Sequence, residues 1–184
     1  MSVTGQQSGR DSSDEVSARS VEGHHPAKEV LVIGGGVAGI ATSLELAEAG
    51  FRVLLCDRSP SIGGALAQMD KWFPDGHCSL CQLLPAFDPN GCSLSCLRSG
   101  FSHPSVETLP LTEVVDVQGE AGNFTATLRT QPRGVDPERC TGCGLCVQAC
   151  PIEVPDEFEM GRSSRKAIYL RHPLLPPNQY AIDW

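Results

Sequence analysis

The sequence predicts an α/β fold that combines a partial Rossmann-like dinucleotide-binding unit, a β-hairpin region and an inserted ferredoxin-like α+β cluster module. Three observations predict it. A glycine-rich turn joins an apolar strand pattern to a helical pattern near the N-terminus. Two alternating segments separated by a Gly-rich turn follow in the middle of the chain. Four closely spaced cysteines, out of nine in the chain, come after them.

The first unit is predicted from the order strand, turn, helix, strand. Residues 30–33 form a short apolar run with three β-branched members, which is typical of a buried parallel strand. The turn 34–39 fits the pattern G-x-G-x-x-G. Residues 40–49 carry apolar side chains at helical spacing, and Gly50 is placed to end that helix. Residues 51–56 then predict a second strand.

Each glycine of the turn has an expected task in binding a dinucleotide. Gly34 allows the tight turn, Gly36 lets a pyrophosphate approach the backbone, and Gly39 lets the helix pack on the strand. The free N–H groups at the start of the helix would face the phosphates, and these belong to the stretch that includes Val37 and Ala38. The competing interpretation is a Gly-rich turn in an α/β unit without a nucleotide.

Acidic and glycine residues after the second strand refine the choice of nucleotide. Asp57 lies 18 residues past Gly39, where a carboxylate can bind the adenosine ribose and disfavours NADP, and Arg58 follows it. Gly63 and Gly64 would bring the chain close to the nucleotide again. This pair resembles the second glycine signature of FAD-binding two-domain flavoproteins, so FAD is favoured over NAD.

The clearest metal motif is a run of the form C-x₂-C-x₂-C-x₃-C-P, made by Cys140, Cys143, Cys146 and Cys150 before Pro151. This spacing is that of bacterial ferredoxins and predicts a [4Fe–4S] cluster. Zinc sites more often pair two C-x₂-C units across a longer gap. The fourth Cys of such a run often binds a neighbouring cluster. Since no Cys follows Cys150 here, either it completes its own cluster or another ligand must come from elsewhere.

A second cysteine group lies between the two predicted units. Cys78, Cys81, Cys92 and Cys96 are spaced C-x₂-C-x₁₀-C-x₃-C and supply four soft ligands. A second iron–sulfur cluster is the first interpretation. Zinc, redox-active thiols and a disulfide are the alternatives.

The middle segment predicts a hairpin, because residues 112–117 and 124–129 alternate apolar and polar side chains around a Gly-rich turn at 119–123. The chain is thereby divided into three parts. These are a disordered tail at 1–28, a nucleotide-binding domain at 29–131 with a Cys-rich loop at 77–97, and an incomplete cluster module at 132–184.

Composition excludes several classes of function. The net charge of −8 and the pI of about 5.0 argue against nucleic-acid binding, which needs clustered Lys and Arg. No apolar run approaches the roughly 20 residues that span a bilayer. The first residues lack a secretory signal, so the cytoplasm is expected, where clustered cysteines more often bind metal than form disulfides.

The motifs together resemble a known family, the A-type subunits of heterodisulfide reductase, whose members carry FAD and iron–sulfur clusters. The resemblance covers most of residues 30–183. Its segments are VLVIGGGVAGI (30–40), PSIGGALAQMDKWFP (60–74), CSLCQLLP (78–85), EVVDVQGEAGNFTATL (113–128), PRGVDPERCTGCGLCVQACPIEVPDEF (132–158) and KAIYL (166–170).

The resemblance implies an electron-transfer role beside other subunits of a reductase complex, with ferredoxin, hydrogenase or formate dehydrogenase as partners. It implies FAD contacts at Gly34, Gly36, Gly39 and Asp57 and cluster ligands at the four ferredoxin-type cysteines. Cys92 and Cys96 depart from the family pattern, since they lie in an insertion of about ten residues. Family members also continue past the segment that ends this chain, so a truncated member is expected.

The same residues also allow two rival functions. One is a non-catalytic iron–sulfur module without FAD, and the other is a zinc-binding interaction protein. The sequence shows no nucleophile–base pair, so no catalytic acid or base is assigned.

Overall fold

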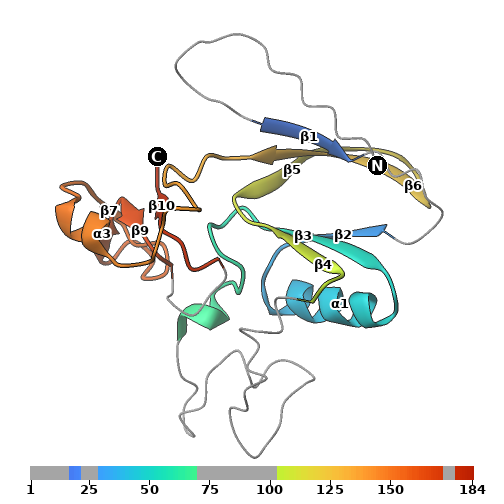
Figure 1. Ribbon diagram of the computed structural model, residues 1–184, viewed down its shortest axis with the longest axis horizontal. Coiled ribbons are helices and arrows are strands. Elements are labelled where there is room, and N and C mark those ends of the chain that lie inside the picture. The colour runs from blue at the N-terminus through green and yellow to red at the C-terminus, as the bar shows by residue number, and fades with distance from the viewer. Residues whose placement is uncertain (1–16, 22–28, 70–102, 172–176) are drawn as a thin grey trace, which may run out of the picture.

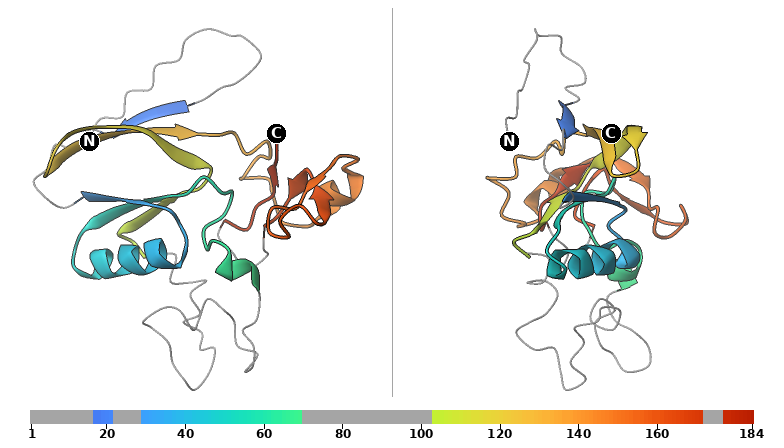
Figure 2. Two further views of the ribbon diagram at one scale, coloured as in Figure 1. Left: turned by 180° about the vertical axis from the view of Figure 1, so that it is seen from behind. Right: turned by 90° about the vertical axis from the view of Figure 1, so that its right-hand side faces the viewer.

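A computed structural model describes residues 17–21, 29–69, 103–171 and 177–184 (Figure 1). Its body is layered: an antiparallel sheet lies above a parallel sheet, and the helix α1 (Val37–Glu48) lies below the parallel sheet. The cluster module lies to one side of these layers, as the view from behind shows (Figure 2). Within the part of the chain that is described, no helix has the length and apolar character needed to cross a bilayer.

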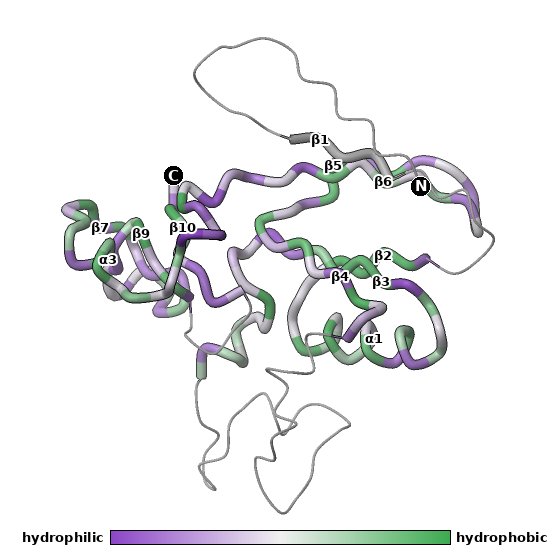
Figure 3. Tube along the Cα trace, in the orientation of Figure 1, coloured by the Kyte–Doolittle hydropathy of each residue, from purple (hydrophilic) through white to green (hydrophobic). Residues whose placement is uncertain are grey.

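The parallel sheet has the strand order β2-β3-β4, with β2 at Glu29–Ile33, β3 at Arg52–Cys56 and β4 at Val106–Leu109. The central strand is buried from its second residue to its last, as expected for a parallel strand covered on both faces. Hydrophobic residues concentrate along these three strands (Figure 3). The two predicted strands are confirmed to within one residue, while β4 is an addition that the sequence pattern did not reveal.

The predicted helix is confirmed as α1, which begins three residues earlier than its apolar pattern and ends at Glu48. Gly50 follows it with a φ of +90°, the left-handed conformation that ends helices and that glycine adopts without strain. The buried face of α1 packs into a core cluster formed by Ile40, Leu55 and Ile62. One face of the helix is therefore fixed on the strand that follows it.

The predicted hairpin is confirmed as β5 (Thr112–Glu120) and β6 (Asn123–Thr130), with a bulge between Val114 and Asp116. Within the segment 1–28, which was predicted as a tail, the structure describes β1 (Ser17–Val21), and this strand pairs antiparallel with the other edge of β6. An edge strand presents unpaired N–H and C=O groups that a second segment can bind. This backbone pairing requires no apolar pattern, which explains why composition did not predict it.

Within its described residues, the cluster module contains one short helix and two small ladders. The helix is α3 (Leu145–Ala149), β7 (Glu153–Pro155) pairs with β8 (Ser164–Lys166), and β9 (Ile168–Tyr169) pairs with β10 (Ala181–Ile182). A short 3₁₀ helix, η1 (Leu66–Met69), follows the glycine pair of the nucleotide unit. The second cysteine group, Cys78, Cys81, Cys92 and Cys96, lies outside the described residues.

A Gly39→Ala substitution should destabilise the fold strongly, because the added Cβ would overlap the carbonyl oxygen of Gly34. We expect a loss of at least about 2 kcal/mol in the free energy of unfolding, measured by urea denaturation. Gly36→Ala is the matched control, since a Cβ there meets nothing within 4 Å. It should cost less than about 1 kcal/mol. Equal losses for the two variants would contradict the packing role of Gly39.

Candidate functional site

The glycine turn between β2 and α1 forms an open cradle. A Cβ at either Gly34 or Gly36 would meet nothing within 4 Å, so space lies beside the backbone at both positions. The N–H of Gly34 donates to the carbonyl of Cys56 at 2.8 Å, which ties the turn to the end of β3. Space for a ligand at Gly36 and close packing at Gly39 are what a dinucleotide fingerprint requires.

The N-terminus of α1 opens into this cradle. Gly36 is the N-cap, no side chain caps it, and the first turn carries no acidic residue. Val37 is half-buried and Ala38 is exposed at this end. The first N–H groups of a helix and its positive dipole end favour an anion, so the arrangement fits a pyrophosphate.

Asp57 connects the cradle to the loop that follows β3. Its Oδ2 accepts a hydrogen bond from the N–H of Gly35 at 2.6 Å, and its Oδ1 accepts one from the N–H of Ser59 at 2.7 Å. A carboxylate has about four acceptor positions, so these bonds leave capacity for further donors such as ribose hydroxyls. Asp57 therefore shapes the site itself, a task that the sequence did not reveal. Arg58 beside it is exposed.

The second glycine pair lies directly against the first glycine turn. The N–H of Gly63 donates to the carbonyl of Gly35 at 2.7 Å, and a Cβ on Gly64 would lie 3.0 Å from the Cα of Gly36. Ile62 is fully buried, and a Cβ on Gly35 would clash with its side chain. The two glycine segments thus form one continuous backbone surface, which explains why both need glycine.

The ferredoxin-type cysteines lie on one loop and the helix that follows it. Gly144 adopts a φ of +80° and forms the N-cap of α3. That helix carries Cys146, and Cys150 is its C-cap. The thiols of Cys140, Cys143, Cys146 and Cys150 are free. In the residues that the structure describes, no three or more His, Cys, Asp or Glu side chains are gathered closely enough to hold a metal ion.

Backbone amides nevertheless point toward the sulfurs of this loop. A hydrogen bond from the Leu145 amide lowers the pKa of the Cys143 thiol below its usual value. A hydrogen bond from the Ile168 amide on β9 does the same for the pKa of Cys150. Amide donors that stabilise thiolate sulfur are also the groups that tune iron–sulfur clusters. The chemistry of this donor set therefore fits a cluster.

Tyr180 is a site residue that sequence reasoning missed. Burial raises the pKa of its hydroxyl, and the neighbouring thiols of Cys146, Cys143 and Cys140 raise it further. A Cβ on Gly144 would lie 3.3 Å from the Tyr180 hydroxyl oxygen. The hydroxyl therefore shares its surroundings with three of the four cysteines. Because Tyr180 is 30 residues from Cys150 in the sequence, no local spacing could have indicated this.

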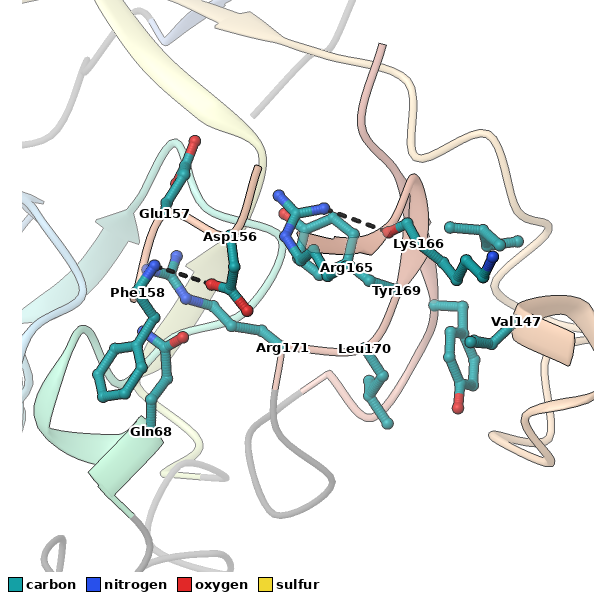
Figure 4. A pocket seen from close by; sticks show the side chains of 12 residues that line it. Gln68, Val147, Asp156, Glu157, Phe158, Arg165, Lys166, Tyr169, Leu170 and Arg171 are labelled. Atoms are coloured by element: carbon teal, nitrogen blue, oxygen red, sulfur yellow. Dashed lines mark hydrogen bonds between the residues drawn. The ribbon is translucent and has the colours of Figure 1, made fainter. Parts of the chain in front are cut away.

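A polar cavity of about 320 Å³ lies between η1 and the cluster module, lined by side chains that include Gln68, Val147, Arg165, Tyr169, Arg171 and Tyr180 (Figure 4). The Arg165 guanidinium stacks over the ring of Tyr169 at 3.7 Å and pairs with Asp183 at 2.7 Å. The charge of Arg165 is therefore already paired with Asp183 and stacked on Tyr169 within the module.

Cys56 and His103 lie in structural positions. Cys56 is 1% exposed, and burial raises the pKa of its thiol, as for a small hydrophobic residue in a strand. The Nδ1 of His103 accepts a hydrogen bond from the N–H of Ser105 at 3.1 Å, a local turn contact.

Comparison with protein families gives two matches, one for each unit. The family model described as FAD dependent oxidoreductase matches residues 29–86, which include the glycine cradle. The model described as 4Fe-4S binding domain matches residues 134–156, which include the four ferredoxin-type cysteines. A solved structure, L-proline dehydrogenase from P. horikoshii, is similar over 55% of this chain and 19% of its own, with 20% identity and a TM-score of 0.36, and this likeness is too weak to support an argument.

Comparison with individual proteins gives matches that run through both units. An iron-sulfur subunit of the CoB--CoM heterodisulfide reductase of Methanopyrus kandleri is 42% identical over 92% of this chain and 24% of its own length. The corresponding subunit of the H(2)/formate:CoB-CoM heterodisulfide,ferredoxin reductase of Methanococcus maripaludis is 44% identical over 85% of this chain and 22% of its own. Both relatives are A-type subunits, and this chain spans about a quarter of their length. Over most of its length this chain is therefore similar to A-type heterodisulfide reductase subunits.

Proposed function

We propose that this chain binds FAD and a [4Fe–4S] cluster and transfers electrons as part of an oxidoreductase of the heterodisulfide reductase type. The observation that carries the proposal is the presence, in one chain, of an open glycine cradle at the N-terminus of α1 and a ferredoxin-type cysteine loop. FAD exchanges electrons in pairs or singly, whereas a cluster carries one at a time.

In this proposal the nucleotide end of FAD is held by the chain's own backbone. Gly34, Gly36 and the first amides of α1, at Val37, Ala38 and Gly39, would hold the pyrophosphate. Asp57 would accept hydrogen bonds from the ribose while it keeps its two backbone donors. The other residues proposed to bind FAD are Arg58, Gly63 and Gly64.

The proposed cluster ligands are Cys140, Cys143, Cys146 and Cys150. The amides of Leu145 and Ile168 stabilise the sulfurs of two of them, which favours the deprotonated form that binds iron. A second cluster at Cys78, Cys81, Cys92 and Cys96 stays a prediction.

The setting of this activity is also proposed. We place the chain in the cytoplasm, in a complex with other subunits of a heterodisulfide-reductase-like enzyme that exchange electrons with ferredoxin, hydrogenase or formate dehydrogenase. We divide the chain from residue 29 onward into a nucleotide unit at 29–131 and a cluster module at 132–184. Names of two relatives, from Methanococcus maripaludis and Methanosarcina acetivorans, include ferredoxin, which supports that partner.

The visible spectrum after anaerobic purification tests the proposed function. Bound flavin should give structured absorption near ~450 nm, and a cluster should give broad absorption that dithionite bleaches. Cluster absorption without flavin would favour an electron-transfer module that lacks FAD. Zinc in the absence of both chromophores would contradict the proposal.

Gly36→Val should abolish flavin retention while the cluster remains, because a branched side chain would fill the open space beside Gly36. We expect the affinity for FAD to fall by at least about tenfold, since the pyrophosphate needs that space. Flavin released by acid is measured against iron content. A folded Gly36→Val protein with unchanged flavin would remove this site from the proposal.

Asp57→Ala should weaken FAD binding by the loss of a charged hydrogen bond, about 1.5–3 kcal/mol. This corresponds to a roughly 10- to 150-fold rise in the dissociation constant, measured by fluorescence titration. Asp57→Asn keeps the shape and one acceptor oxygen, so it separates charge from geometry. An effect of Asp57→Ala below about twofold would mean that the carboxylate acts only on the backbone.

Cys146→Ser should remove the ferredoxin-type cluster and lower the iron content by about four atoms per chain. Cys56→Ala is the control, because Cys56 is buried in β3 and should leave iron unchanged. Iron and acid-labile sulfide are measured together. If both variants retain equal iron, Cys146 is not a ligand.

A further inference from the structure

Arg133 lies where the nucleotide unit meets the cluster module. Its Nη2 donates to the carbonyl of Pro60 at 2.7 Å, and its Nη1 donates to the carbonyl of Gln179 at 3.1 Å. Its own carbonyl accepts a hydrogen bond from the N–H of Ile182 at 3.0 Å. One half-buried residue therefore joins segments that are 73 and 46 residues away in the sequence.

On one side Arg133 holds the loop that shapes the nucleotide cradle. Pro60 is buried and lies between two contacts of that loop with the glycine turn. Before it, Asp57 accepts from the amides of Gly35 and Ser59, and after it Gly63 donates to Gly35. A displacement of Pro60 would therefore disturb both contacts.

On the other side Arg133 holds the segment that lies along the cysteine loop. The side chain of Gln179 donates to the carbonyl of Pro137 at 3.0 Å, three residues before Cys140. The adjacent Asn178 side chain would lie 3.6 Å from a Cβ on Gly142. Tyr180, next along the segment, shares its surroundings with three of the cysteines.

The charge of Arg133 adds to this arrangement. Burial lowers the pKa of its guanidinium, while nearby Cys140 and Tyr169 raise it. A guanidinium stays protonated in proteins, so the charge is permanent and lies close to a proposed cluster ligand. Its planar fork can reach two carbonyls at once, whereas an ammonium group is a compact point charge.

A second contact crosses the same junction. With its amide oxygen turned toward Arg171, Gln68 of η1 accepts two hydrogen bonds from that guanidinium, at 3.0 and 3.1 Å. Two arginines of the cluster module region thus bind the segment between Asp57 and Met69. Specific hydrogen bonds from two arginines therefore join the cluster module to the nucleotide unit.

We propose that Arg133 is a positioning residue that clamps the cluster module onto the nucleotide loop through the carbonyls of Pro60 and Gln179, and so couples FAD binding to the environment of the cluster. The inference rests on the proposed function. Coupling between sites is reciprocal, so FAD should stabilise the segment 177–182 and alter the cluster's reduction potential. Both effects should pass through Arg133.

The test uses the full chain with its cluster, with and without saturating FAD, in four forms. These are wild type, Arg133→Met, Arg133→Lys and Arg162→Met. Arg133→Met removes the fork and the charge, whereas Arg133→Lys keeps the charge but cannot bind both carbonyls in the same way. Arg162→Met removes an equal charge from an exposed turn. Arg133→Lys carries the test if Arg133→Met does not fold.

The first readout is amide hydrogen exchange. In wild type and Arg162→Met, FAD should slow exchange at Gly63 and, by roughly tenfold, at Ile182, as expected from one charged hydrogen bond. In Arg133→Met the slowing should persist at Gly63 and vanish at Ile182. Equal slowing at Ile182 in wild type and both Arg133 variants would overturn the clamp.

The second readout is the midpoint potential of the cluster, followed by its visible absorption. FAD should shift it in wild type and Arg162→Met but not in Arg133→Met, with Arg133→Lys in between. An identical FAD-dependent shift in all four forms would overturn the coupling. If wild type binds no FAD or holds no cluster, the proposed function itself fails, which is a different result.

Discussion

The nucleotide site depends on the carboxylate of Asp57, which holds two segments of backbone in place. Asp57 accepts the amides of Gly35 and Ser59 and so ties the glycine turn to the loop after β3. Backbone N–H groups away from water need partners, and a carboxylate is the strongest short acceptor that a side chain offers. With those bonds in place, Gly63 can bind Gly35, and the two glycine segments form one surface. The cradle at Gly36 is what remains open.

The same loop also determines where the cluster module lies. Pro60 presents its carbonyl to Arg133, whose other hydrogen bond reaches the segment beside the cysteine loop. A series of hydrogen bonds between side chains and backbone therefore runs from the glycine turn to the surroundings of Cys140. Both proposed cofactors would rest on backbone amides, α1 amides for the phosphates and loop amides for the sulfurs. This explains the density of glycine at both sites.

Several elements followed from local pattern alone. β2, α1, β3 and the β5–β6 hairpin have the apolar spacing and turn residues that their conformations require. β4 and β1 could not be predicted from local pattern, because each is a short strand placed by pairing with the edge of a neighbouring strand. Tyr180 and Arg133 also escaped prediction, because their partners lie 30 or more residues away. Distant contacts leave no periodic trace in a sequence.

By itself the sequence determined the local motifs of this protein. The spacing of its glycines and of Cys140, Cys143, Cys146 and Cys150 specifies backbone approach and soft ligands, which are local properties of the chain. Only the tertiary structure decided that Asp57 binds the turn it follows, that Gly64 lies against Gly36, and that Arg133 joins two units. Those contacts depend on how separate segments pack, and packing is set by the whole fold because each segment limits the space left for the others.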